Sequence, residues 1–386
     1  MKTKTTNQIR AFFGVGFLFL TLGSFVPNRV AASGEPTISA VSAALIEADS
    51  GRIIFEKSGE ETLPIASTTK MMSALLTLES SELDRYFTVD PSAILVEGTS
   101  MGLLKGDQVT LRILAAGMLL ASGNDAANAA AVKVAGSQDE FAIMMNRRAA
   151  QIGMKNTNFV TPSGLDAQSH YSTAMDMAKL GRAALQNADF KKICAQKSAK
   201  LSYGNPPYDR WLSNHNKLLK IYPDAIGIKT GFTKKAGRCL VSAAEREGVT
   251  LICVTLKASS DWEDHRKLLD YGFERVQAIE LPTELGTVTI PLVGGMKNFV
   301  TPVVQTPLKA TITEDDLAKI SWKIISEPFL YAPVSAGDSI GEIRYYLNGE
   351  RIKTAPITAK ESVEVSAKPP KISFLEKIKR WFFEWK

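Results

Sequence analysis

The chain has 386 residues, and 45% of them are hydrophobic, which is enough to bury a large core and to build more than one domain. Its formal net charge of +6 is concentrated at the two ends, because residues 1–32 carry four basic and no acidic side chains and residues 371–386 carry five basic and two acidic ones. The residues between these segments are close to neutral overall, so the composition excludes a protein that binds the phosphate backbone of a nucleic acid.

The first 32 residues have the pattern of a secretory signal peptide. Three basic residues lie within the first ten positions, residues 11–26 form an apolar run, and Val30-Ala31-Ala32 supplies small residues for cleavage after Ala32. The alternative is an uncleaved membrane anchor, although the run is shorter than the roughly 20 residues that span a bilayer. We therefore expect a secreted protein.

The first candidate functional motif is Ser67-Thr68-Thr69-Lys70, which follows Pro64. The apolar residues after it continue to Leu78 without a helix breaker, so a buried helix should begin at Ser67. Positions three apart lie on one face of a helix, which places the Lys70 amine beside the Ser67 hydroxyl. A serine hydroxyl needs a nearby base to become a nucleophile, and Lys70 could be that base if burial and a second cation keep it neutral.

Two further motifs follow, Ser122-Gly123-Asn124 and Lys229-Thr230-Gly231. Lys229 is the candidate for the second cation that lowers the pKa of Lys70. Residues 225–230 indicate a buried strand, and the glycine at its end would let an extended peptide approach and add to the strand edge. The backbone N–H groups at the start of the helix at Ser67 are suited to stabilising an oxyanion.

Each motif also has a purely structural explanation. Ser67 could be a helix N-cap, Ser122-Gly123-Asn124 a turn, and Lys229-Thr230-Gly231 the end of a strand. Lys57-Ser58-Gly59 even repeats the third pattern, but it precedes the serine. The order of the three motifs and the context of each therefore carry the functional interpretation.

The cysteines and histidines do not indicate a metal site or a cofactor. Cys194, Cys239 and Cys253 are widely spaced, and we expect buried free thiols, although one pair remains possible outside the cytoplasm. The three histidines have no metal-ligand spacing, so we expect surface or structural side chains. They are His170, His215 and His265.

The pattern of elements changes near residue 275. Between residues 33 and 275, apolar strands such as 43–47 and 251–255 flank long helical segments, which predicts an α/β domain with a helical subdomain. Residues 276–368 have short alternating runs such as 287–290, and Asn348-Gly349 is a hairpin turn after the run 343–347. We expect a small all-β domain there, acting as a spacer.

Residues 369–386 follow a Pro-Pro break and have the pattern of an amphipathic helix. The polar and charged side chains face away from an apolar arc, and the expected site of this helix is the membrane interface. A helix packed on its own domain is the alternative. The apolar arc consists of Phe374, Leu375, Ile378, Trp381, Phe382 and Trp385.

With these motifs in order, the chain resembles the serine-type D-alanyl-D-alanine carboxypeptidases of the peptidase S11 type, which are low-molecular-mass penicillin-binding proteins. Shared segments also surround the motifs and include Gly164-Leu165-Asp166. The resemblance implies the serine transpeptidase/β-lactamase fold, with an antiparallel sheet. It further implies that Ser67 is the acylated nucleophile, Lys70 its general base, and Ser122 the residue that relays the proton to the leaving amine.

The substrate-binding residues are also carried over by motif. Asn124 would hold Lys70 and the substrate amide, and Lys229 and Thr230 would face the terminal carboxylate. Gly231 would allow the close approach of the substrate, and the backbone N–H groups of Ser67 and Phe232 would form the oxyanion hole. Family members often have histidine where Phe232 stands, and the backbone donor survives that change. Lys257 is a candidate for a further basic residue at the carboxylate.

The resemblance implies a membrane-attached enzyme, on the extracytoplasmic face, that acts on peptidoglycan stem peptides and is acylated by β-lactams. One alternative is a class A-like β-lactamase, which needs a glutamate that activates the deacylating water. No glutamate lies between Glu140 and Glu245, and Asp166 near the expected place belongs to the carboxypeptidase pattern. The other alternative is a non-catalytic peptidoglycan-binding homologue, against which the intact Ser67 and Lys70 argue.

Overall fold

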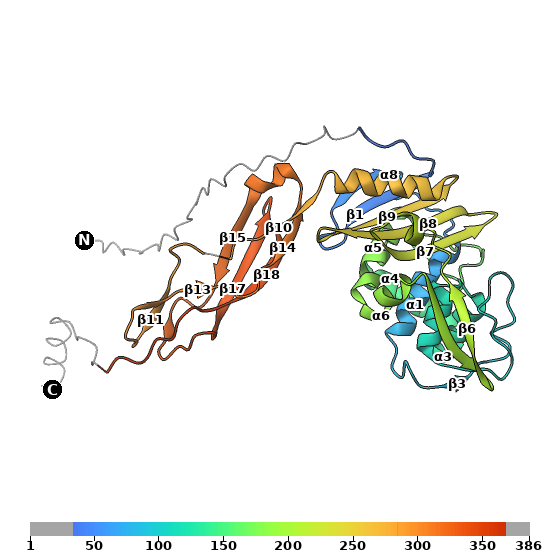
Figure 1. The fold of residues 1–386 in the computed structure, drawn as a ribbon, viewed down its shortest axis with the longest axis horizontal. Coiled ribbons are helices and arrows are strands. Elements are labelled where there is room, and N and C mark those ends of the chain that lie inside the picture. Colours follow the sequence, from blue (N-terminus) through green and yellow to red (C-terminus); the bar gives the residue numbers. More distant parts are fainter. Residues whose placement is uncertain (1–33, 284, 368–386) are drawn as a thin grey trace, which may run out of the picture. The chain divides into compact units, whose positions relative to one another are not determined.

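The computed structural model describes residues 34–283 and 285–367 (Figure 1). A five-stranded sheet with strand order β2-β1-β9-β8-β7 forms the centre of the first part. Every neighbouring pair is antiparallel, which confirms the predicted sheet. The strands are β1 Ser42–Glu47, β2 Ile53–Lys57, β7 Ala225–Thr233, β8 Gly237–Arg246 and β9 Val249–Ala258.

The sheet is covered on both faces, so its central strands are apolar on both sides. Alternating residues separate into two cores, with Ile252 in the one that faces the helical subdomain and Leu251 in the one that faces α8 (Asp261–Phe273). Glycines let one helix approach each face closely. Gly181 of α5 (Ala174–Gln186) packs on Ile252, and Gly272 of α8 packs on Leu251.

The helical subdomain lies between β2 and β7 in the sequence. Several of its helices begin at a side-chain cap, such as Thr110 before α2, whose hydroxyl accepts a hydrogen bond from the Ile113 N–H at 3.2 Å. The remaining elements are the 3-10 turn η1 (Ala66–Thr69), α1 Lys70–Leu78, α2 Leu111–Leu119, α3 Asn124–Ala135, α4 Gln138–Ile152, α6 Ala188–Cys194 and α7 Leu218–Ile221, with the short pairs β3 Phe87–Thr88 and β4 Gln108–Val109, and β5 Ser198–Gly204 and β6 Pro207–Ser213.

The second part is rich in β structure and has its own hydrophobic core. The predicted hairpin is confirmed, because Asn348 and Gly349 both have positive φ and join β17 to β18. The predicted strand at residues 287–290 is wrong at its start, because a turn at Gly286 and Thr287 delays the strand to Ile290. The elements are β10 Gln277–Glu280, β11 Ile290–Val293, β12 Phe299–Val300, β13 Pro302–Val303, β14 Lys309–Ile312, the 3-10 turn η2 Glu314–Lys319, β15 Ile320–Ile325, β16 Leu330–Tyr331, β17 Ser339–Leu347 and β18 Glu350–Ala359.

Two predicted segments lie outside the described residues, namely the signal peptide at residues 1–32 and the amphipathic helix at residues 369–386. Within residues 34–283 and 285–367, no helix combines the length and the hydropathy needed to cross a bilayer.

Candidate active site

Ser67 and Lys70 lie at the junction of η1 and α1, beneath the edge strand β7. Ser67 is in the 3-10 turn, half-buried, and Lys70 is the first residue of α1. The predicted helix therefore begins with a tighter turn than an α-helix. Lys70 Nζ lies 3.0 Å from Ser67 Oγ, so the spacing of three residues brings the amine into hydrogen-bond distance of the hydroxyl.

Lys70 is fully buried and has two more partners, because its Nζ lies 2.6 Å from both Asn124 Oδ1 and the Ser163 carbonyl oxygen. Burial lowers the pKa of Lys70 well below its ordinary value, with help from the Lys229 cation and against the opposing charge of Asp125. A neutral amine has two N–H donors and one lone pair. Asn124 and Ser163 can take both donors, which leaves the lone pair free to accept a proton from Ser67.

Ser122 and Lys229 form a second hydroxyl–amine pair. Ser122 has a positive φ of 59° in the turn between α2 and α3, and its Oγ lies 3.0 Å from Lys229 Nζ. Lys229 also donates a hydrogen bond of 2.8 Å to the carbonyl oxygen of Thr230. Burial lowers the pKa of Lys229 to about 7, so its charge changes near neutral pH.

Asn124 connects Lys70 to the loop before α2. Its Oδ1 faces Lys70, and its Nδ2 donates a hydrogen bond of 2.6 Å to the Glu97 carbonyl oxygen. The next residue of this loop, Gly98, has a φ of +87°, and a Cβ there would lie 2.7 Å from Asn124 Nδ2. Only glycine lets the loop close over the amide.

The edge of β7 lies against the turn that holds Ser67. A Cβ on Gly231 would lie 3.1 Å from the Ser67 nitrogen and 3.0 Å from the Ile65 carbonyl oxygen, so the glycine sets this close approach. Thr230 is half-buried, and the Phe232 side chain is 66% exposed. β7 has a strand partner on one side only, which leaves its other edge open to an extended ligand. Lys257 is exposed, with its stem over Gly237 at the end of the β7–β8 turn.

A buried chain of hydrogen bonds through His170 lies next to Ser67, and the sequence patterns did not predict it. His170 Nε2 lies 2.8 Å from Thr69 Oγ1, which donates a hydrogen bond of 2.8 Å to the Ala66 carbonyl oxygen. His170 Nδ1 accepts hydrogen bonds from the N–H groups of Val160 and Thr161 at 3.1 and 3.3 Å. The ring is therefore neutral with its proton on Nε2, and burial lowers its pKa to about 4.

The His170 chain joins the loop 160–170 to the turn of Ser67. This loop also supplies the Ser163 carbonyl oxygen that contacts Lys70. Gly164 has a φ of +78°, and a Cβ there would lie 2.1 Å from the Ala66 carbonyl oxygen. Both segments therefore require this glycine for their close contact. Asp166 lies in the same loop but contacts β7 and not the turn of Ser67. Its carboxylate accepts a hydrogen bond of 3.1 Å from the Thr233 hydroxyl at the end of β7.

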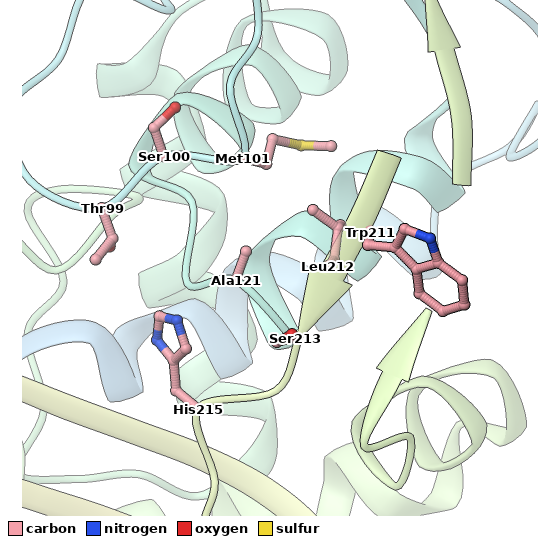
Figure 2. Close-up of a pocket in the computed structure, with 8 residues that line it drawn as sticks. All are labelled: Thr99, Ser100, Met101, Ala121, Trp211, Leu212, Ser213 and His215. Atoms are coloured by element: carbon pink, nitrogen blue, oxygen red, sulfur yellow. The ribbon is translucent and has the colours of Figure 1, made fainter. Parts of the chain in front are cut away.

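A hollow of about 370 Å³ is lined in part by Ala121, the residue before Ser122 (Figure 2). One wall comes from the loop between β3 and β4, where the Thr99 hydroxyl donates a hydrogen bond of 2.6 Å to the Ser122 carbonyl oxygen. Partial burial lowers the pKa of His215, as does the positive charge of the nearby Lys229. The lining residues are Thr99, Ser100, Met101, Ala121, Trp211, Leu212, Ser213 and His215.

The cysteines and the other histidine have structural places. Cys194, Cys239 and Cys253 are free and buried, which confirms the prediction for these thiols. His265 is fully buried between the hydroxyls of Ser242 and Thr255, at 2.6 and 2.9 Å. In the part of the chain that the structure describes, no three His, Cys, Asp or Glu residues cluster as metal ligands would.

Comparisons with known proteins find relatives along most of the chain. Residues 29–260 match the sequence profile of the D-alanyl-D-alanine carboxypeptidases, and residues 273–365 match that of the penicillin-binding protein 5 C-terminal domain. The D-alanyl-D-alanine carboxypeptidase DacF of Bacillus subtilis is 30% identical over 96% of this chain and 97% of its own length. DacC of Escherichia coli is 31% identical over 96% of both chains.

Solved structures show the same likeness. Penicillin-binding protein 5 from Haemophilus influenzae superposes with a TM-score of 0.64 and 27% identity, over 86% of this chain and 99% of its own. The Streptomyces K15 DD-transpeptidase superposes with a TM-score of 0.60 and 31% identity, over 62% of this chain and 99% of its own. The second match leaves more than a third of this chain uncovered.

Proposed function

Because the chain belongs to the D-alanyl-D-alanine carboxypeptidase family, we propose that it releases the terminal D-alanine of peptidoglycan stem peptides through an acyl-enzyme on Ser67. The observation that carries this proposal is the 3.0 Å contact between Lys70 Nζ and Ser67 Oγ, at a buried lysine whose pKa is lowered. A neutral Lys70 takes the hydroxyl proton as Ser67 attacks the carbonyl carbon between the two D-alanines. A tetrahedral oxyanion results, with the backbone N–H groups of Ser67 and Phe232 as its donors.

Collapse of this intermediate expels the terminal D-alanine, whose amine must gain a proton. Ser122 is the proposed relay for that proton, supported by its 3.0 Å contact with Lys229. Lys229 and Thr230 are the proposed partners of the substrate carboxylate, and Asn124 holds Lys70 while it exchanges the proton. Water then hydrolyses the ester, which frees Ser67 and restores the starting protonation of the site.

β-Lactams are proposed to acylate the same serine and to remain bound for minutes or longer. A class A β-lactamase needs a glutamate after the second motif to activate water, and residues 141–244 contain none. The matching relatives and structures favour the carboxypeptidase over this alternative.

The proposed arrangement of the mature protein places it outside the cytoplasmic membrane. Residues 1–32 act as the signal peptide, residues 33–275 as the catalytic domain, and residues 276–368 as the β-rich domain. Residues 369–386 attach the protein to the membrane surface, which is supported by the apolar arc of that segment and the basic residues beside it.

Mass spectrometry after exposure to penicillin tests the proposed nucleophile. The purified protein should gain one penicillin-sized adduct, mapped to the peptide that contains Ser67. Ser67→Ala should gain none and should not release D-alanine, whereas Ser92→Ala, which changes an exposed serine, should behave like the unmodified chain. An adduct on another residue would overturn the assignment of Ser67.

A further inference from the structure

One sheet of the β-rich part exposes an apolar face. The sheet has the order β12-β11-β16, and along β11 the residues alternate, with Ile290 and Leu292 buried in the core while Pro291 and Val293 point outward. Sheets with one solvated face normally place polar residues there. The outward positions of these three short strands hold no charged residue.

The strand register shows that the outward side chains form one surface. Phe299 lies opposite Pro291, and Tyr331 lies opposite Val293, so these residues share the outer face. The rings of Phe329 and Tyr331 contact edge to face, with centroids 5.4 Å apart. We call this surface the outer face, and it includes Val293, Phe299, Phe329 and Tyr331, all exposed, with Tyr331 at 69%. Met296, which is 75% exposed, lies in the loop that joins β11 to β12.

The chain leaves the described structure at the edge of this face. Val365 bridges to Gly295, and the Ser366 N–H donates a hydrogen bond of 2.8 Å to the Gly294 carbonyl oxygen. Residues 368–386 begin two positions later, and their sequence combines aromatic residues with a cluster of lysine and arginine. Only a few residues of the chain therefore separate the apolar face from the amphipathic sequence.

We propose that the outer face is a membrane-contact surface, which rests in the interfacial layer of the same bilayer that residues 369–386 bind. Phenylalanine, tyrosine and methionine side chains partition favourably into this layer, and tyrosine can keep its hydroxyl in the wet headgroup zone. At its margin Lys297 and Glu361 form an ion pair with each other, so neither charge opposes contact with lipid as an isolated group.

A second copy of the chain fits the face less well, because the area is small. Four residues of β11 span roughly 13 Å, and three strands span roughly 10 Å across the sheet. A stable protein interface buries about 800 Å² on each partner, far more than such a face provides. A bilayer has no such threshold, since each immersed side chain adds to the binding of an existing anchor.

Vesicle binding by the full-length mature chain gives the first test. We expect Met296→Ser, Phe299→Ser and Tyr331→Ser together to weaken binding to phosphatidylcholine/phosphatidylglycerol vesicles about tenfold, equivalent to about 1.4 kcal/mol. The matched control replaces three exposed apolar residues elsewhere, Tyr86, Leu95 and Ile143, by serine and should change binding less than twofold. Both variants should release D-alanine from a soluble peptide normally. Equal vesicle binding by the two variants would overturn the proposal, whether or not the proposed enzymatic function holds.

A spin label at Met296→Cys gives the second test and separates the possible occupants. The native cysteines are buried, so labelling is selective, and Leu95→Cys is the matched exposed control. With vesicles, the label at 296 should become more accessible to oxygen and less accessible to a water-soluble nickel chelate, while the control label does not change. A label shielded from both reagents without vesicles would instead assign the face to residues 368–386, and shielding that grows with protein concentration would assign it to a second copy. Unchanged accessibility in vesicles would also contradict membrane contact.

Discussion

Thr69 and His170 meet through a 2.8 Å contact between Oγ1 and Nε2, although they are 101 residues apart in the sequence. The contact fixes the hydroxyl of Thr69, which then donates to the Ala66 carbonyl oxygen just before Ser67. Through its other nitrogen, His170 holds the loop that contacts Lys70. One imidazole ring therefore connects the segments that carry the proposed nucleophile and the partner of its base.

Removing the Thr69 hydroxyl should disturb the turn of Ser67. Thr69→Val keeps the shape of the side chain and leaves His170 Nε2 and the Ala66 carbonyl oxygen without their partner, which costs about 1–3 kcal/mol of stability. We expect its rate of acylation by penicillin to fall about tenfold, whereas Thr69→Ser, which keeps the hydroxyl, should stay within about threefold of the unmodified chain. Normal acylation by Thr69→Val would show that the hydroxyl has no role in positioning Ser67.

The same histidine should limit stability in acid. Its pKa is near 4 in the folded protein and near 6.5 in the unfolded chain, so the unfolded state binds more protons between these values. The free energy of unfolding is therefore undiminished above pH 6.5 and falls by up to roughly 3 kcal/mol as the pH drops toward 4. Urea unfolding at pH 7 and pH 4.5 should show a smaller difference for His170→Gln than for the unmodified chain. An equal difference for both would assign the acid sensitivity to other groups.

The place of His170 could not have been predicted from the sequence, because its partners at positions 69, 160 and 161 come from separate segments. The three motifs could be recognised from the sequence. The contact between Ser67 and Lys70 could also be predicted, because both residues lie in one turn. The pairing of Ser122 with Lys229 needed the fold, which brings a turn of the helical subdomain to the edge strand. The hollow beside Ser122 was also hidden, because its walls come from a loop and from the end of β6, which are far apart in the sequence.

The two buried lysines should give the reaction a bell-shaped pH profile. Release of D-alanine requires neutral Lys70, so kcat/KM should rise with pH through the lowered pKa of Lys70. If the Lys229 cation attracts the substrate carboxylate, kcat/KM should fall again as Lys229 loses its proton near pH 7. In Lys229→Met the activity should be much lower, and the descending limb should disappear. A descending limb that persists in this variant would belong to another group.

Stability measurements give an independent check on Lys229. Its pKa is lower in the folded protein than in the unfolded chain, so the unfolded state binds the extra proton between about pH 7 and 10.5, and the free energy of unfolding rises with pH in that window. Between pH 7.5 and 9.0 this lysine should contribute roughly 1–2 kcal/mol to the rise. The rise should be smaller by that amount in Lys229→Met. Parallel curves for the two proteins would mean that Lys229 keeps its ordinary pKa.

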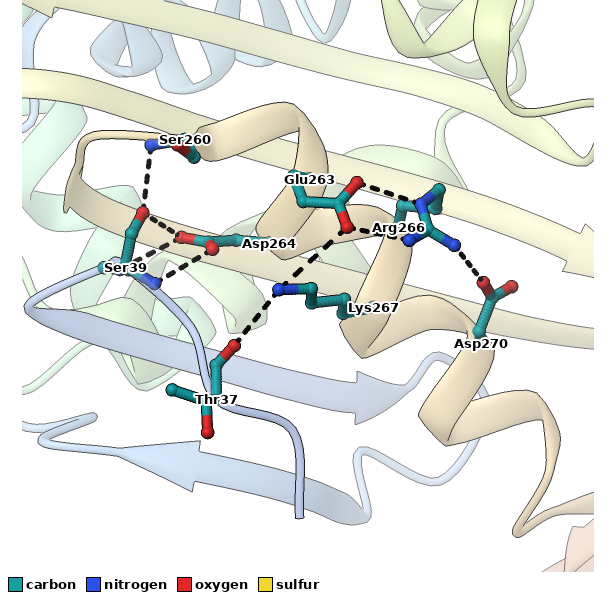
Figure 3. Close-up of polar contacts among 9 residues, drawn as sticks. Thr37, Ser39, Ser260, Glu263, Asp264, Arg266, Lys267 and Asp270 are labelled. Carbon is teal, nitrogen blue, oxygen red and sulfur yellow. Dashed lines mark hydrogen bonds and ion pairs between the residues drawn. The ribbon is translucent and has the colours of Figure 1, made fainter. Parts of the chain in front are cut away.

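Asp264 of α8 holds the segment that precedes β1 (Figure 3). Its carboxylate accepts hydrogen bonds from the Ser39 N–H at 2.9 Å, the Ser39 hydroxyl at 2.7 Å and the Ala40 N–H at 3.0 Å. Asp264→Asn turns an amide N–H₂ group toward these donors and should lower the free energy of unfolding by about 1–3 kcal/mol. Glu263→Gln on the same helix is the control, because its exposed ion pairs with Arg266 and Lys267 contribute little. Faster hydrogen exchange should be confined to the amides of Ser39 and Ala40 and their neighbours, and unchanged exchange there would contradict the anchoring role.

Asp125 organises the wall of the hollow and also acts on Lys70. Its carboxylate accepts hydrogen bonds from the N–H groups of Met101 and Leu103 at 2.9 and 3.0 Å and from the Ser100 hydroxyl at 2.6 Å. Its negative charge raises the pKa of Lys70 against the effect of burial. Asp125→Asn should therefore have two separate effects, one on the loop and one on the base.

The loop effect should depend on the length of the substrate. Without the carboxylate, residues 100–103 lose their common acceptor, so KM should rise about tenfold for a stem peptide long enough to reach the hollow and much less for an N-acylated D-Ala-D-Ala dipeptide. The charge effect should appear with both substrates, because a lower Lys70 pKa moves the ascending limb of the pH profile to lower pH. Asp90→Asn, at an exposed turn, is the control and should leave both quantities unchanged. If Asp125→Asn raises KM equally for both peptides, the hollow does not bind the stem. If the ascending limb stays in place, the group that sets it is not Lys70.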